Sequence, residues 1–200
     1  MGVILYYCLG SYSKNLFFVP DERLYIQAAK ALANGDVISY NGMSSTFQKI
    51  VYSIIISPAF MVKDLHIQIR LVCLIGSMAE MTYIFPVYLI SRQLNVSRTK
   101  SLLLSLFGLS FPTLLFSMTF MSETAFLPLW LWMIYLIILM LDTDKTIIVI
   151  PVLAGVVGYI LYMCKEVGVV ALPAFVFVKI FLVVEDRDNR GDLLKVFYKE

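Results

Sequence analysis

The chain has 200 residues, of which 60% are hydrophobic and only 15% are charged. This composition, together with long apolar runs, is typical of an integral membrane protein and disfavours an ordinary soluble domain. The formal net charge of +2 is too small to indicate a nucleic-acid partner. The three cysteines lie in apolar runs without C-x-x-C spacing, which disfavours a disulfide framework or a zinc site.

Residues 1–9 form an apolar segment that is shorter than the about 20 residues a spanning helix requires. We expect this segment to be the outer part of a first transmembrane helix, and a free interfacial segment is the alternative. A signal peptide fits poorly because no basic residues precede the apolar stretch.

An amphipathic helix is predicted over residues 21–34, within an outer loop that spans residues 10–65. Asp21 suits its N-cap, Glu22 suits the positive end of the helix dipole, and Gly35 suits a C-terminal stop. Apolar residues gather on one face and polar residues on another. Such a helix lies on a bilayer surface or against other helices and does not cross the membrane.

The segment 47–62 is apolar but too short to span, and it carries Pro58 near its end. We therefore expect a re-entrant or interfacial helix. Five candidate spans follow, each with about the length that a hydrocarbon core requires. They cover residues 66–90, 100–119, 123–141, 146–164 and 168–184. With the first helix, the sequence predicts an all-α polytopic membrane protein with about six transmembrane helices in one transmembrane domain.

The orientation follows from the basic residues of the short loops. Arg92, Arg98 and Lys100 lie in one connection, whereas the connection 117–123 has no lysine or arginine. The positive-inside rule therefore places the first connection in the cytoplasm and the 10–65 loop on the exoplasmic side.

Several ionisable residues are candidates for chemistry at the outer face. The pair Asp21 and Glu22 can simply begin a helix, or it can supply a general base at the membrane surface. Glu123, which follows Ser122, can likewise begin a helix or orient a substrate hydroxyl. Lys165 and Glu166 are either a charged loop pair or a phosphate ligand held by its neighbouring acid.

Two further charges lie within the predicted spans. Arg70 can extend to the interface or contact a phosphate. Glu80 lies near the middle of a span, where an ionisable group is costly, so we expect it to face the bundle interior. His66, at a predicted helix start, is interpreted as an interfacial residue. No metal-ligand spacing and no Gly-rich phosphate loop is present in the sequence.

An ordered set of motifs resembles integral-membrane glycosyltransferases of the GT-C superfamily, which are similar to protein O-mannosyltransferases and lipid A aminoarabinose transferases. The resemblance begins with Pro20-Asp21-Glu22-x-x-Tyr25-x-x-Ala28-x-x-Leu32-x-x-Gly35 and covers nearly the whole chain. The later matches are Tyr52-Ser53-x-x-x-Ser57-Pro58-Ala59, Arg70-Leu71-Val72, Tyr88-Leu89-Ile90-Ser91-Arg92, Pro112, Ser122-Glu123 and Lys165-Glu166.

The resemblance implies sugar transfer from a polyprenyl-phosphate donor to a lipid, glycan or protein hydroxyl, at the outer face of the plasma (inner) membrane. It makes Asp21, with Glu22, the catalytic carboxylate site, and reaction would invert the anomeric carbon. Glu123, Lys165, Glu166 and Arg70 are candidates for substrate binding. The assignment of Lys165 and Arg70 to the donor phosphate follows from their positive charge and their predicted side of the membrane, and not from the resemblance.

The chain departs from the family in having a shorter first helix and fewer spans, so we expect it to be the N-terminal portion of a longer enzyme. The alternatives are a non-catalytic truncated homologue, a subunit of a membrane complex and, less favoured, a transporter or flippase that uses Glu80. The sequence does not identify the sugar or the acceptor, and it leaves open whether a divalent metal cofactor is required.

Overall fold

The computed structural model describes residues 20–40, 43–44, 49–108, 120–141, 148–171 and 173–177. This part of the chain is helical apart from one short antiparallel pairing, in which Ser39–Tyr40 (β1) faces Met43–Ser44 (β2). The predicted all-α class is therefore confirmed for the described residues. The segment 1–9, with its predicted first helix, lies outside the described residues.

Helix α2 covers Pro20–Asn34 and corresponds to the predicted amphipathic helix. Its N-cap was assigned incorrectly to Asp21, because the helix already begins at Pro20, whose fixed φ suits a first turn. The predicted C-terminal stop is confirmed. Gly35 has φ +73°, its N–H bonds to Leu32 O, and the N–H of Asp36 bonds to Ala31 O at 2.8 Å. This Schellman arrangement satisfies carbonyls that the helix end would leave unpaired.

The predicted re-entrant segment contains two short helices. Helix α3 covers Ile50–Ile56 and passes directly into the 3-10 helix η1, Ser57–Met61. Pro58 has no N–H to continue the α-helical pattern, which explains the change at this point. The combined apolar stretch Ile50–Met61 is shorter than a spanning helix needs.

Helices α4, Leu65–Met81, and α5, Ile84–Gln93, occupy the first predicted span after the outer loop. The side chain of Asp64 caps α4 by accepting a hydrogen bond from the N–H of Ile67 at 3.0 Å. A turn at Thr82 divides the stretch that corresponds to the predicted span 66–90 into these two helices. Pro86 explains this turn, since a proline ring clashes with the carbonyl four residues earlier.

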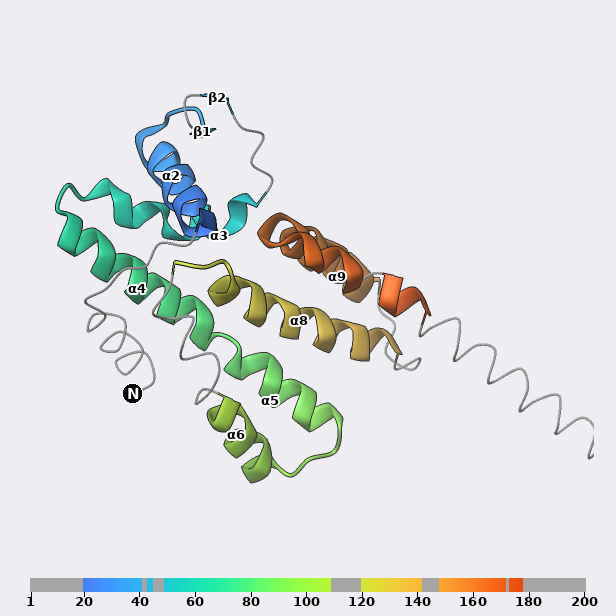
Figure 1. Ribbon diagram of the computed structural model, residues 1–200. Coiled ribbons are helices and arrows are strands. Elements are labelled where there is room, and N and C mark those ends of the chain that lie inside the picture. The colour runs from blue at the N-terminus through green and yellow to red at the C-terminus, as the bar shows by residue number, and fades with distance from the viewer. Residues whose placement is uncertain are drawn as a thin grey trace, which may run out of the picture.

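The remaining described helices are α6 (Arg98–Phe107), α8 (Glu123–Leu141) and α9 (Val149–Cys164), followed by the 3-10 helix η4 (Glu166–Val170). Helix α8 packs against α4, α5 and α9, while α2 rests on α3 and η1 (Figure 1). Helices α5 and α6 form a hairpin that extends from this body (Figure 1). The α2, α3 and η1 group therefore covers the end of the bundle where α8 begins.

Within the described ranges, two helical stretches are long and apolar enough to cross a membrane, Leu65–Gln93 and Glu123–Leu141. They correspond to the predicted spans 66–90 and 123–141. Helix α9 reaches 16 residues, fewer than the about 20 that a perpendicular crossing requires. The predicted spans 100–119 and 168–184 both run into residues outside the described ranges.

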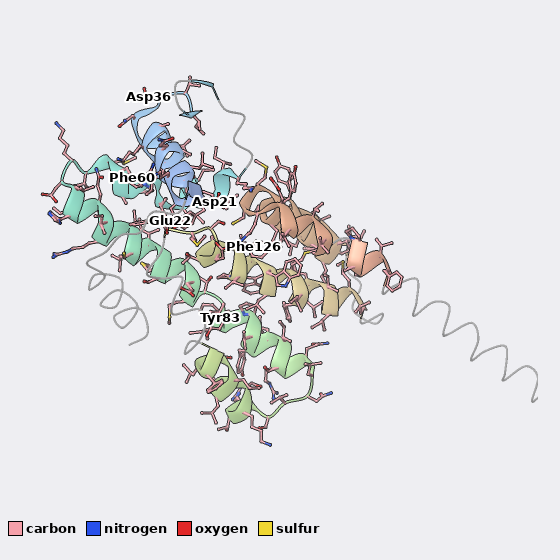
Figure 2. All side chains as sticks on the ribbon, in the orientation of Figure 1. Asp21, Glu22, Asp36, Phe60, Tyr83 and Phe126 are labelled. Carbon is pink, nitrogen blue, oxygen red and sulfur yellow. The ribbon has the colours of Figure 1, made fainter. Side chains whose placement is uncertain are left out.

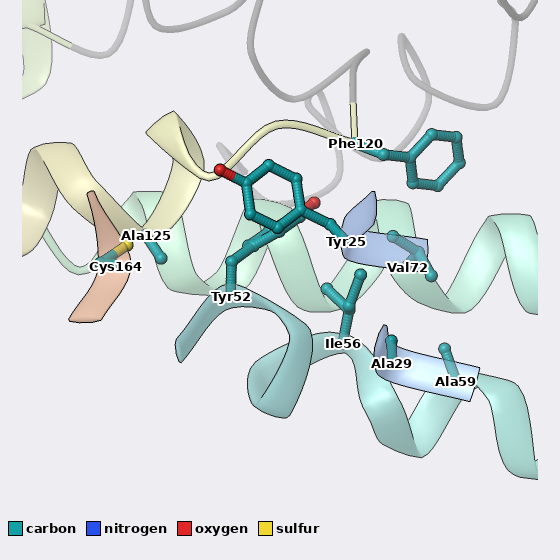
Figure 3. Close-up of a cluster of buried hydrophobic side chains, with 9 residues drawn as sticks. All are labelled: Tyr25, Ala29, Tyr52, Ile56, Ala59, Val72, Phe120, Ala125 and Cys164. Atoms are coloured by element: carbon teal, nitrogen blue, oxygen red, sulfur yellow. The ribbon is translucent and has the colours of Figure 1, made fainter. Parts of the chain in front are cut away.

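The described core has two parts. One lies beneath α2 and holds the aromatic rings of Tyr25 and Tyr52, which meet edge to face with centroids 5.4 Å apart (Figure 3). The other lies between α8 and α9. Its buried members are Met133, Leu136, Met140, Ala154, Leu161 and Ala171.

Candidate functional site

The two predicted catalytic carboxylates have opposite environments. Asp21 is exposed to solvent, whereas Glu22 is only 2% exposed. Carboxylate oxygen Oε1 of Glu22 accepts a hydrogen bond from the backbone N–H of Phe120 at 2.9 Å. A hydrogen bond to a charged group in the interior contributes about 1.5–3 kcal/mol. Glu22 thus fastens the first turn of α2 to the residue Phe120 just before α8, and Asp21 is the carboxylate that a substrate can reach.

Tyr25 connects the same turn of α2 with the beginning of α8. Its hydroxyl donates to the Oγ of Ser122 at 3.0 Å, and its backbone oxygen accepts from the Oγ of Ser53 at 3.1 Å. Burial raises the pKa of the Tyr25 hydroxyl, the hydrogen bond to Ser122 lowers it, and the charges of Asp21 and Glu123 raise it further. Tyr25 therefore lies within electrostatic reach of two of the predicted acidic site residues, Asp21 and Glu123.

Glu123 and Lys165 form an ion pair between the start of α8 and the end of α9. Their side chains are 17% and 34% exposed, so the pair is only partly screened by water. The Sγ of Cys164 donates to the backbone oxygen of Ser122 at 3.7 Å, which holds the two helix ends together next to this pair. The structure thus brings Glu123 and Lys165 together, as predicted for residues of one site.

One of the two interpretations had Lys165 held by the neighbouring acid Glu166, and in this detail it is wrong. Glu166 instead pairs with Lys49, just before α3, at 3.5 Å. The Glu166 side chain is 68% exposed, and exposed pairs of this kind typically contribute about 0–1 kcal/mol. The two ion pairs therefore form a row of side chains whose charges alternate in sign. Its order is Glu123, Lys165, Glu166 and Lys49.

Arg70 is exposed on α4. Within the described ranges it makes no hydrogen bond or ion pair with the other predicted site residues. Asp21 likewise makes no direct bond to Glu123 or Lys165 within the described ranges. Tyr25 lies between them, because it is near Asp21 on α2 and its hydroxyl bonds to Ser122, which precedes Glu123. The site as described is a polar rim around Tyr25 and Ser122, formed by the first turns of α2, the start of α8 and the end of α9. Figure 2 shows Asp21 and Glu22 at the start of α2.

Sequence reasoning did not single out Lys49 or Cys164 as parts of this rim. Their only local signal is position, since Cys164 precedes Lys165 and Lys49 precedes the short helix α3. Among the described residues no three histidine, cysteine, aspartate or glutamate side chains gather as metal ligands.

Comparisons of the chain with protein-family models, with curated proteins and with solved structures found no match.

Proposed function

We propose that the chain is a multi-pass membrane glycosyltransferase that moves a sugar from a polyprenyl-phosphate donor to a hydroxyl of a lipid, glycan or protein. The reaction would take place at the outer face of the plasma membrane, with about six transmembrane helices holding the rim in place. The sequence motifs around Asp21 supply the resemblance on which this proposal rests. The observation that supports it most is the grouping of an exposed carboxylate on α2 with the Glu123 and Lys165 pair through Tyr25.

In the proposed reaction Asp21 accepts the proton of the acceptor hydroxyl. The acceptor oxygen forms a bond to the anomeric carbon while the bond from that carbon to the phosphate oxygen breaks, which inverts the anomeric configuration. The phosphate gains negative charge as it leaves. Lys165 stabilises this charge more strongly in the transition state than in the ground state, which is the condition for catalysis.

The other rim residues have supporting roles in this proposal. Glu123 keeps Lys165 oriented, Glu166 keeps the start of η4 near α3 through Lys49, and the buried Glu22 fixes the helix that carries Asp21. Arg70 would serve as a further phosphate contact from α4.

A donor-turnover assay tests the proposal. Membranes that contain the full-length protein are supplied with radiolabelled polyprenyl-phosphate hexose and pentose donors, and the loss of donor is measured. Asp21→Asn keeps the shape of the side chain but removes its basicity, so turnover should fall by about 10²–10⁴-fold. Asp36→Asn is the matched control, because Asp36 is also an exposed aspartate and lies just beyond the far end of α2. Full turnover by the Asp21→Asn protein, or the same loss in both variants, would contradict the proposal.

A second candidate is a non-catalytic subunit of a membrane complex. The observation that favours it is the ion pair itself, because a Lys165 ammonium already neutralised by Glu123 attracts a phosphate less strongly. In that case the protein would turn over no donor of the panel, and Asp21→Asn would change nothing.

A further inference from the structure

A cavity of about 220 Å³ lies between α2, η1 and the first half of α4, on a different flank of α2 from Asp21. Ile26 and Lys30 of α2 form one wall, Phe60 of η1 forms another, and Leu65 and Ile69 of α4 form the third. Phe120 closes the cavity on the side of α8.

The lining is apolar with a single positive charge. The ammonium of Lys30 lies 5.7 Å from the centroid of the Phe60 ring, a cation–π geometry. Gln68 also lines the cavity, but its side-chain amide donates to the backbone oxygen of Val62 at 2.6 Å. Lys30 makes no ion pair with any carboxylate in the part of the chain that the structure describes. Its charge is therefore available to a ligand.

The size and the edge of the cavity indicate what could enter it. Whole-ligand sites usually measure about 300–1,000 Å³, so this cavity suits a segment of a chain and not an entire ligand. Met61 and Leu65, at the junction of η1 and α4, are 70% and 60% exposed. Leu65 lines the cavity and Met61 follows the lining residue Phe60, so the cavity edge presents exposed apolar side chains, as helices in a membrane interface do.

We propose that this cavity holds part of an acyl chain of an anionic phospholipid, with the lipid phosphate paired with Lys30. This inference needs the membrane placement proposed above but not the transfer reaction. A lysine on an interfacial helix keeps its stem on apolar surface and its ammonium among the head groups. An extended peptide is a poor occupant, because it would need partners for its backbone polar groups that these walls do not offer.

The inference predicts a lipid preference that depends on Lys30. The reporter is a single tryptophan, introduced as Leu65→Trp after Trp130→Phe and Trp132→Phe remove the native ones. The full chain is reconstituted in phosphatidylcholine vesicles with equal fractions of brominated phosphatidylglycerol or brominated phosphatidylcholine as the quencher. One positive charge near a membrane surface is worth about 1 kcal/mol, so phosphatidylglycerol should bind about fivefold more tightly.

The control variants decide between outcomes. Lys30→Gln should remove the preference, whereas Lys63→Gln, an exposed lysine in the link between η1 and α4, should keep it. Equal preference for both lipids in the parent protein, or equal losses in the two variants, would overturn the inference. Displacement of the brominated phosphatidylglycerol by an equal fraction of polyprenyl phosphate would also overturn it, since the cavity would then belong to an isoprenoid chain. None of these results measures sugar transfer, so they do not depend on the proposed reaction.

Discussion

The hydroxyl of Tyr25 donates a hydrogen bond to the hydroxyl of Ser122 at 3.0 Å, across 97 positions of sequence. One turn earlier in α2, Glu22 accepts from the backbone of Phe120. These two bonds join the helix that carries the exposed carboxylate to the start of α8. They decide where Asp21 stands relative to the Glu123 and Lys165 pair.

Tyr25→Phe should lower the free energy of unfolding by about 0.5–1.5 kcal/mol, the usual net contribution of a hydrogen bond. The variant removes the bond to Ser122 and keeps the ring that packs against Tyr52. Thermal unfolding in detergent measures the effect. Tyr159→Phe is the control, because Tyr159 is 64% exposed on α9 and should tolerate the change. Equal unfolding midpoints for both variants would show that the Tyr25 bond contributes nothing.

A double-mutant cycle on Glu123→Gln and Lys165→Gln should give a coupling energy of about 0.5–3 kcal/mol. The reason is that each single variant leaves a partly buried charge without its partner, whereas the double variant removes both charges. The same cycle on Lys49→Gln and Glu166→Gln is the matched control. That pair is more exposed, so its coupling should stay within about 0.2–1 kcal/mol. A larger coupling in the exposed pair would contradict this ranking.

Gly168→Ala should destabilise the junction between α9 and η4. A Cβ at Gly168 would lie 2.7 Å from the carbonyl carbon of Leu161, a backbone atom that cannot move aside cheaply. Because η4 follows directly on Lys165, we also expect a weaker coupling between Lys165 and Glu123. Gly155→Ala is the control, on the neighbouring helix α9, where a Cβ would meet no atom of the described residues within 4 Å. Alanine there should be neutral or stabilise by up to about 1 kcal/mol through helix propensity. A neutral Gly168→Ala variant would show that η4 is not packed as described.

Glu80→Met should raise the unfolding temperature. Glu80 is completely buried, and neither carboxyl oxygen has a hydrogen-bond partner among the residues that the structure describes. A buried polar group without a partner costs about 1–3 kcal/mol, and an apolar side chain of similar size removes that cost. For a chain of this length the gain corresponds to roughly 2–4 °C per kcal/mol.

Glu80→Gln is the comparison for this prediction, since it keeps the polar atoms buried and should stabilise the protein less. If Glu80→Met instead destabilised the protein while Glu80→Gln was tolerated, a polar atom would be required at this position. That result would favour the transporter alternative, in which Glu80 lies on a polar path.

The helix boundaries that depend on local sequence signals were predicted well. The amphipathic pattern and Gly35 located α2 to within one residue at its N-terminus, and Glu123 and Leu141 were predicted as the ends of α8. The turn at Thr82 was missed although Pro86 carries its cause, because prolines are tolerated in many membrane helices.

The site was predicted only in part. The residue types and their positions at helix ends indicated that Glu123 and Lys165 would meet, and they do. The sequence could not predict that Asp21 is exposed and Glu22 buried, because the position of Glu22 depends on a backbone amide nearly a hundred residues away. The partner of Glu166 was likewise beyond local reasoning, since Lys49 approaches from another element.

The central claim is that α4 and α5 cross the membrane and leave the Asp21 rim at its outer face. Single cysteines test it most directly, introduced as Asp36→Cys or Ser97→Cys after Cys8, Cys73 and Cys164 are replaced by alanine. Asp36 lies just beyond α2 and Ser97 lies beyond α5, and both are exposed. In intact cells an impermeant maleimide should label the Asp36→Cys protein at once and the Ser97→Cys protein only after permeabilisation. Labelling of both from the same side, or of the Ser97→Cys protein alone from outside, would contradict the account.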